Sequence, residues 1–152
     1  MNPLARANAL ALAIPGLLMA GALGSQFIGG FYPCEMCHWQ RWPHYAAIAL
    51  ALLAFFGKPP ARNVMIALAA LAVLTSGAIG VFHAGVEYHW WQGITTCSST
   101  AAGTSLEDIM RAPLIRCDAA QWTFGGISLA GFNALFSIAG GIAILALVRK
   151  AK

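Results

Sequence analysis

Three runs without a charged residue are the longest apolar stretches of the chain, at 7–32, 63–86 and 119–148. Each is longer than the ~18 apolar residues at which a membrane helix becomes the default interpretation. A fourth run, 42–57, is short for a ~30 Å hydrocarbon core, so its helix must begin near Cys37 and include Arg41. We predict transmembrane helices at about 7–28, 38–57, 63–82 and 124–148.

The composition supports this pattern and excludes the main soluble classes. Of the 152 residues, 59% are hydrophobic and 9% are charged, whereas a soluble domain carries about 25% charged residues. A soluble enzyme and a disordered chain are therefore excluded, and no basic run is present to bind nucleic acid. We predict a single all-α membrane domain over 1–152, a bundle of four transmembrane helices.

The distribution of Lys and Arg predicts the orientation. Four helices place both ends of the chain and the 57–63 connection on one side of the membrane. That side holds six of the nine basic residues: Arg6, Lys58, Arg62, Arg149, Lys150 and Lys152. The opposite side holds the other three and all five acids. By the positive-inside rule, the ends are cytoplasmic and two loops, at about 29–37 and 83–123, face outward. A cleaved signal peptide in the first thirty residues is the alternative, but it would leave an odd number of spans.

All four cysteines fall in the two outward loops: Cys34 and Cys37 in the first, Cys97 and Cys117 in the second. Static disulfides in an oxidising compartment are one interpretation, and four cysteines allow three pairings. A bridge between Cys34 and Cys37 would close a very small loop and constrain the unfolded chain little. The Cys-x-x-Cys spacing therefore favours redox turnover over a structural disulfide.

Arg41 lies four residues after Cys37, on the same face of the expected second helix. Its positive charge and the helix N-terminus both stabilise a thiolate at Cys37. The alternative is that Arg41 is an anchor at the membrane surface, with its charged head in water.

Two metal chemistries also fit some of these residues. Cys34-x-x-Cys37-His38 matches the c-type haem attachment pattern, but a haem would leave Cys97 and Cys117 unexplained. Zinc on four cysteines is disfavoured because 19 residues separate the second pair. We expect no metal. The histidines are expected to be polar residues of the membrane interface: His38, His44, His83 and His89.

The second loop contains a capping box, with Thr104 at the N-cap and Glu107 three residues later. It predicts a short helix at about 105–112, ended by Pro113, with one apolar face. Beside a bilayer such a helix is expected to lie in the interface. Packing on the loop's own core is the alternative.

Together these motifs resemble the DsbB family of bacterial disulfide bond formation proteins over essentially the whole chain. The first cysteine pair has the form Pro33-Cys34-x-x-Cys37-x-x-x-Arg41. The segments Glu87 to Trp91 and Gly93 to Cys97 resemble the approach to the third cysteine of the family. The fourth-cysteine motif is Cys117-Asp118-x-x-x-Trp122-x-Phe124-Gly125-x-Ile127-Ser128, followed by Asn133. The loop between Cys97 and Cys117 is shorter than in some members.

The resemblance implies an enzyme of the bacterial inner membrane, a protein-dithiol:quinone oxidoreductase with periplasmic cysteines. It would reoxidise a DsbA-like periplasmic dithiol protein, supporting oxidative protein folding, and pass two electrons to ubiquinone or menaquinone. A membrane scaffold or small channel with structural disulfides is the alternative from another class.

The resemblance also implies redox-active disulfides Cys34–Cys37 and Cys97–Cys117. Cys97 corresponds to the sulfur that the partner attacks, and Cys117 to the thiolate that then attacks Cys34. Cys37 corresponds to the cysteine that contacts the quinone, and Arg41 to the arginine of the quinone site.

Overall fold

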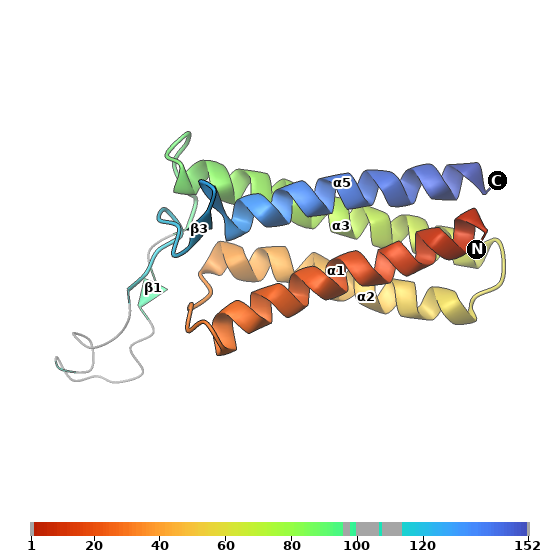
Figure 1. Cartoon of the computed structure of the whole chain (residues 1–152), viewed down its shortest axis with the longest axis horizontal. Coiled ribbons are helices and arrows are strands. Elements are labelled where there is room, and N and C mark those ends of the chain that lie inside the picture. The colour runs from red at the N-terminus through yellow and green to blue at the C-terminus, as the bar shows by residue number, and fades with distance from the viewer. Residues whose placement is uncertain (1, 96–97, 100–106, 108–113, 152) are drawn as a thin grey trace.

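The computed structural model describes residues 2–95, 98–99, 107 and 114–151. Its framework is four long helices: α1 (Pro3–Phe27), α2 (Glu35–Phe56), α3 (Ala61–Glu87) and α5 (Leu129–Lys150). They run alternately up and down, so that both ends of the chain lie at the same end of the bundle (Figure 1). The expected all-α, four-helix architecture is confirmed.

Each helix packs mainly against its two neighbours in a ring, α1 on α2 and α5, and α3 on α2 and α5. Small side chains dominate the core at the end of the bundle that carries both chain ends, including Ala7, Ala47 and Ala70. Between α3 and α5, a Cβ added at Gly80 would lie 3.0 Å from the Ala130 carbonyl oxygen. Small residues that let helix backbones approach closely are typical of helix packing in membranes.

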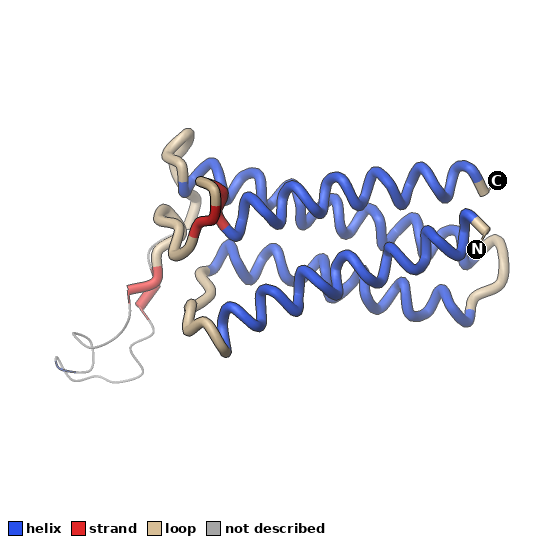
Figure 2. Tube along the Cα trace, in the orientation of Figure 1, coloured by secondary structure: helices blue, strands red, loops and turns tan. Residues whose placement is uncertain are grey.

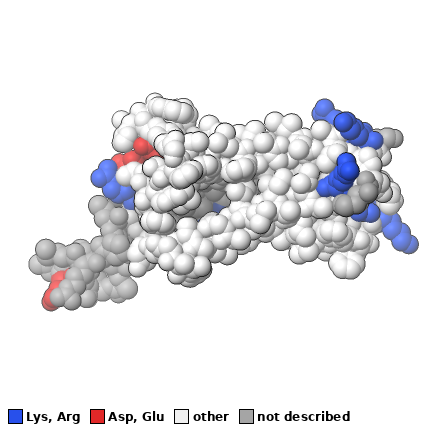
Figure 3. Space-filling model, viewed as in Figure 1, with Lys and Arg blue, Asp and Glu red and all other residues white. Residues whose placement is uncertain are grey.

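Three of the helices, α1, α3 and α5, are long and apolar enough to cross a membrane. The first turns of α2 are more polar and include Glu35, Gln40 and Arg41. Large apolar side chains face outward along the bundle. Lys and Arg gather at the end with the two chain ends, and acidic residues lie at the opposite end (Figure 3). This distribution is that of a multi-pass membrane protein.

Four predicted boundaries are wrong by several residues. Helix α1 begins at Pro3 rather than 7, because the Asn2 side chain caps it by accepting a hydrogen bond from the Ala5 amide. Helix α2 begins at Glu35 rather than 38, because the Cys34 sulfur caps it by accepting a hydrogen bond from the Cys37 amide. Helix α3 continues to Glu87 rather than ending at 82. The segment 83–87 is therefore helical, not loop, because His83 and Glu87 face the bundle, where His83 has hydrogen-bond partners.

Helix α5 begins at Leu129 rather than 124, because a hairpin precedes it. Strands β3 (Thr123–Phe124) and β4 (Ile127–Ser128) are antiparallel. Gly125 and Gly126 connect them, with φ of 57° and 80°, conformations that glycine adopts without strain. Strands β1 (Ser98–Ser99) and β2 (Leu114–Ile115) form a second small antiparallel sheet. Both sheets lie at the end of the bundle opposite the two chain ends (Figure 2).

Two of our predictions fall outside the described residues. These are the short helix at about 105–112, of which Glu107 alone is described, and the position of Cys97.

Candidate active site

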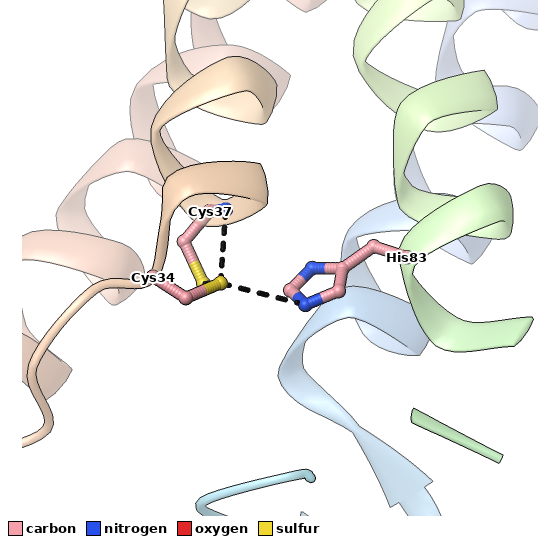
Figure 4. A group of neighbouring side chains, drawn as sticks. All are labelled: Cys34, Cys37 and His83. Atoms are coloured by element: carbon pink, nitrogen blue, oxygen red, sulfur yellow. Dashed lines mark hydrogen bonds between the residues drawn. The ribbon is translucent and has the colours of Figure 1, made fainter. Parts of the chain in front are cut away.

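Cys34 and Cys37 lie at the start of α2, where the chain enters the bundle (Figure 4). Their sulfur atoms are 2.9 Å apart and unbonded, so the structure shows a dithiol. Cys34 is 2% exposed, whereas Cys37 is half-buried. The pair therefore has one enclosed and one more accessible sulfur, which is the asymmetry expected for thiol–disulfide exchange.

Cys34 lies in an environment that disfavours its thiolate. Its hydrogen bond with the Cys37 sulfur and its burial both raise the pKa of the Cys34 thiol, and the Cys117 side chain acts in the same direction. Cys117 packs in the same buried cluster as Cys34, together with Val86 and Ile115. One cysteine of the second loop thus lies beside one cysteine of the first.

Arg41 points into the bundle from α2 rather than out toward water. Its guanidinium donates to Gln26 Oε1 at 2.6 Å and to the Ala22 carbonyl at 3.3 Å, both on α1. These bonds hold the charge one helical turn beyond Cys37. An arginine fixed in this way is better suited to a binding site than to anchoring at a surface.

A cavity of about 410 Å³ opens beside Cys37 and Arg41. Its wall is mainly apolar and comes from α1, α2 and α5, including Leu18, Phe132 and Phe136. Its polar lining includes Cys37, Arg41, Gln40, His44, His83, Glu87, Arg116, Gln121 and Asn133. A hollow is visible in Figure 3, between the ends of the bundle. The volume lies in the range of pockets that hold small organic ligands.

A chain of buried hydrogen bonds extends from the cysteine pair into the bundle. His83 Nε2 lies 3.5 Å from Cys34 Sγ, and His83 Nδ1 lies 2.8 Å from Gln40 Nε2. Gln40 Oε1 accepts from Asn133 Nδ2 at 2.7 Å, and Asn133 Oδ1 lies 2.9 Å from His44 Nε2. The network therefore joins α2, α3 and α5 around the inner wall of the cavity.

The expectation that the histidines are interfacial is wrong for two of them. His44 is 3% exposed and His83 is 1% exposed, and both have hydrogen-bond partners inside the bundle. Ser76 also belongs to this network, because its hydroxyl oxygen lies 2.9 Å from His44 Nε2. Gln40 and Ser76 were missed by sequence reasoning, and Asn133 was named only through the family motif. The available signal was the presence of single polar residues in otherwise apolar helices, where an unpaired amide is costly.

The outer loop carries an exposed ion pair at the edge of the site. Arg116 donates to both carboxylate oxygens of Asp118, at 2.8 and 2.7 Å. These bonds lower the pKa of the Asp118 carboxyl to about 2. Gln121 also donates to the Tyr32 carbonyl at 2.6 Å, which joins the second loop to the first.

The two thiols and His83 are also close enough to share a metal ion. One ligand atom from each of Cys34, Cys37 and His83 lies within 4.8 Å of the others. This set supplies three of the four ligands that a structural zinc takes. The expectation of a metal-free site stays a prediction.

A membrane helix bundle with a dithiol at a helix N-terminus, beside an apolar cavity with an arginine, defines a membrane-embedded thiol oxidoreductase. Residues 5–147 match the family model described as "Disulfide bond formation protein DsbB". The chain belongs to this family, as the resemblance predicted, and is a membrane disulfide oxidoreductase.

One curated relative is similar over most of both chains. It is "Uncharacterized protein RP370" of Rickettsia prowazekii (strain Madrid E), 25% identical over 138 residues, which cover 86% of this chain and 80% of the relative. No solved structure matches the chain.

Proposed function

We propose that this protein reoxidises a periplasmic, DsbA-like dithiol protein and passes the two electrons to a membrane quinone. The observation that carries the proposal is the common position of Cys37 and Arg41 on the wall of one apolar cavity. A thiolate donor and a fixed cation next to a space for a lipid-soluble molecule are the groups that such an electron transfer needs.

The cavity has the chemistry to hold a quinone head group. Its walls are apolar, and Arg41 offers a guanidinium to an oxygen that becomes anionic on reduction. His44 Nδ1 is buried without a hydrogen-bond partner, although His44 lines the cavity. An unpaired polar atom here fits a ligand with polar groups at its edge. When bound, the quinone supplies the two-electron acceptor.

The protein's own residues supply the thiol–disulfide exchange. The partner's thiolate attacks Cys97, and Cys117 leaves as a thiolate that attacks Cys34 in the Cys34–Cys37 disulfide. Cys37 then leaves as a thiolate beside Arg41. The packing of Cys34 and Cys117 in one buried cluster supports the middle step.

The proposed topology places these cysteines on the periplasmic side of the inner membrane, with the chain ends in the cytoplasm. It is supported by the collection of basic residues at the end of the bundle with both chain ends (Figure 3).

The decisive test is quinone reduction by the purified, detergent-solubilised chain. A reduced thioredoxin-like periplasmic protein is the electron donor, and quinone absorbance gives the rate. We expect turnover that is abolished by Cys37→Ser. Absence of quinone reduction, with the four cysteines intact, would contradict the proposal, and a haem absorption band in the same sample would favour the c-type haem interpretation.

A further inference from the structure

The direction of the buried hydrogen-bond network is fixed by one backbone carbonyl. Gln40 Nε2 lies 3.2 Å from the Met36 carbonyl oxygen and 2.8 Å from His83 Nδ1. A carbonyl oxygen can only accept, so the end of the Gln40 amide that faces Met36 must be the NH₂ group. Its second hydrogen then points at His83, and its Oε1 accepts from Asn133 Nδ2 at 2.7 Å.

This direction determines which nitrogen of His83 carries the proton. Nδ1 accepts from Gln40 and is therefore unprotonated, so the ring is neutral and carries its hydrogen on Nε2. Nε2 lies 3.5 Å from Cys34 Sγ, as the dashed line in Figure 4 marks. The network thus directs an N–H donor at the more buried of the two sulfurs.

We propose that His83 is a catalytic residue that donates its Nε2–H hydrogen bond to Cys34 whenever that sulfur is a thiolate. Gln40 is the positioning residue that keeps the hydrogen on Nε2. The inference rests on the proposed function, in which Cys34 exchanges disulfide bonds with both Cys37 and Cys117.

A donor is needed at this position because water cannot solvate the Cys34 thiolate. Cys34 is 2% exposed, and burial is one of the two main causes that raise the pKa of its thiol. A buried anion without a hydrogen-bond donor carries a large desolvation cost. A neutral N–H lowers that cost without adding a second buried charge.

The step that benefits most is the one that regenerates the disulfide of the second loop. The partner's second thiolate displaces Cys97 from the mixed disulfide, and the partner leaves oxidised. The Cys97 thiolate then forms a bond with Cys117, the Cys34–Cys117 bond breaks, and its electron pair remains on Cys34. The exchange involves no net oxidation and no proton transfer, so His83 keeps its hydrogen throughout. His83 also lies close to the backbone of Cys117, so it is beside both sulfur-bearing residues of the breaking bond.

Several ionisable groups face this pair and must be held constant in any titration. They are Cys37 and Arg41 on α2, Glu87 on α3, whose carboxylate is 3.7 Å from His83 Nε2, and Cys117 in the second loop. Helices α1 and α5 carry ionisable charge at Arg6, Arg149 and Lys150, all toward the end of the bundle with the two chain ends. Replacing the other cysteines removes two of these groups.

The test is a thiolate titration of Cys34 as the sole cysteine, in the full chain with Cys37, Cys97 and Cys117 changed to Ser. Thiolate ultraviolet absorbance gives the midpoint, in detergent and with a chelator present. We expect His83→Leu to raise the midpoint by about 1–2 pH units, the worth of one charge-assisted hydrogen bond. Asn8→Leu, the loss of a buried polar side chain near the other end of the bundle, should leave it unchanged.

Two amide variants keep the test independent of folding defects. The Gln amide nitrogen reaches the position of histidine Nε2, whereas that of Asn reaches only the position of Nδ1. We therefore expect His83→Gln to keep most of the wild-type midpoint and His83→Asn to shift it as His83→Leu does. Equal midpoints for wild type, His83→Asn and His83→Leu would overturn the proposal.

Gln40 is tested through its effect on His83. Without the amide, His83 Nδ1 loses its donor and the ring populates both tautomers. Gln40→Leu should therefore raise the Cys34 midpoint by less than His83→Leu does. In the double variant, Gln40→Leu should add little to the shift that His83→Leu causes alone. Additive shifts would contradict the positioning role.

The titration needs neither quinone nor partner, so it separates this inference from the proposed function. In the four-cysteine protein, His83→Leu should lower the maximal rate of quinone reduction by about ten- to a hundredfold. The Cys34–Cys117 disulfide should accumulate, as seen by non-reducing peptide mapping. A normal rate in His83→Leu would overturn the proposal, whereas an inactive wild type would contradict only the proposed function.

Discussion

His44 on α2 and Asn133 on α5 form a hydrogen bond through the middle of the bundle, with His44 Nε2 2.9 Å from Asn133 Oδ1. The two helices are not neighbours in the ring, and the two residues are 89 positions apart in the chain. Asn133 Nδ2 donates to Gln40 Oε1, and its Oδ1 also accepts from Ser137. One amide therefore satisfies several buried groups on three helices at the inner wall of the cavity. This contact holds in place both the cavity and the network that orients His83.

Replacing Asn133 should destabilise the protein measurably. Asn133→Leu leaves Gln40 Oε1 unpaired and removes one of the two acceptors of His44 Nε2, at a cost of about 1–3 kcal/mol. The measurement is thermal or denaturant unfolding in detergent. Ser137→Ala is the matched control, since it removes one hydrogen bond to the same amide, and we expect it to cost less than about 1 kcal/mol. Equal stability of Asn133→Leu and wild type would show that this amide is not needed.

The bundle was largely predictable from the sequence, because charge-free runs of membrane length have few other interpretations. The residues at which the helices begin and end could not be predicted. Glu87 was expected in the outward loop, yet α3 extends to it because its side chain faces the bundle and is 8% exposed. Gly125 and Gly126 form a turn inside an apolar run whose composition favoured helix.

The cysteines and Arg41 could be found from spacing alone, but the buried network could not. Gln40, His83 and Asn133 are isolated polar residues with no periodic relation to one another. They meet only because α3 packs against both α2 and α5 in the folded bundle. A single polar residue in an apolar helix indicates a hydrogen bond somewhere, and the fold supplies the partner.

The close approach of α3 and α5 gives a packing prediction. A Cβ at Gly80 would lie 3.0 Å from the Ala130 carbonyl oxygen, and backbone cannot move aside as a side chain can. We expect Gly80→Ala to lower stability by about 1–3 kcal/mol, the usual cost of overpacking. Gly16→Ala is the control, because no atom lies within 4 Å of its added Cβ. The measurement is thermal or denaturant unfolding of both variants in detergent. Equal stability of Gly80→Ala and wild type would mean that α3 and α5 can move apart without cost.

The raised pKa of Cys34 predicts selective labelling of the reduced cysteine pair. A raised pKa keeps Cys34 as a thiol at neutral pH, and its thiolate appears only above the ordinary range of cysteine. With Cys97 and Cys117 changed to Ser, iodoacetamide should label Cys37 at least about tenfold faster than Cys34 at neutral pH.

Labelling at several pH values separates ionisation from access in that experiment. Burial slows labelling equally at all pH values, whereas a raised pKa makes the Cys34 rate rise steeply with pH. Unfolded protein in detergent is the control, in which both cysteines should react alike. A rate ratio that does not change with pH would contradict the raised pKa.

The proposed order of exchange predicts which variant traps the partner. Cys117→Ala should hold a mixed disulfide between Cys97 and the periplasmic dithiol protein, because the neighbouring thiolate is absent. Cys97→Ala should trap no partner. Non-reducing electrophoresis after mixing with oxidised partner measures both, because the Cys97 thiolate can open the partner's disulfide by exchange. A reversal would mean that the roles of the two cysteines are exchanged.

Arg41 is expected to serve quinone reduction rather than to anchor the helix. Its guanidinium is held inside the bundle by Gln26 and the Ala22 carbonyl, at the wall of the cavity that Cys37 also lines. One charge-assisted hydrogen bond is worth roughly 1.5–3 kcal/mol, or about ten- to a hundredfold in rate or affinity. Arg41→Gln should raise the KM for quinone or lower kcat by that factor, with normal membrane insertion.

Arg41→Lys should recover part of the loss, since it keeps the charge without the planar fork. Arg6→Gln, an exposed arginine at the other end of the bundle, should change neither constant. Wild-type kinetics for Arg41→Gln across a full quinone titration would make Arg41 a structural residue that ties α2 to α1.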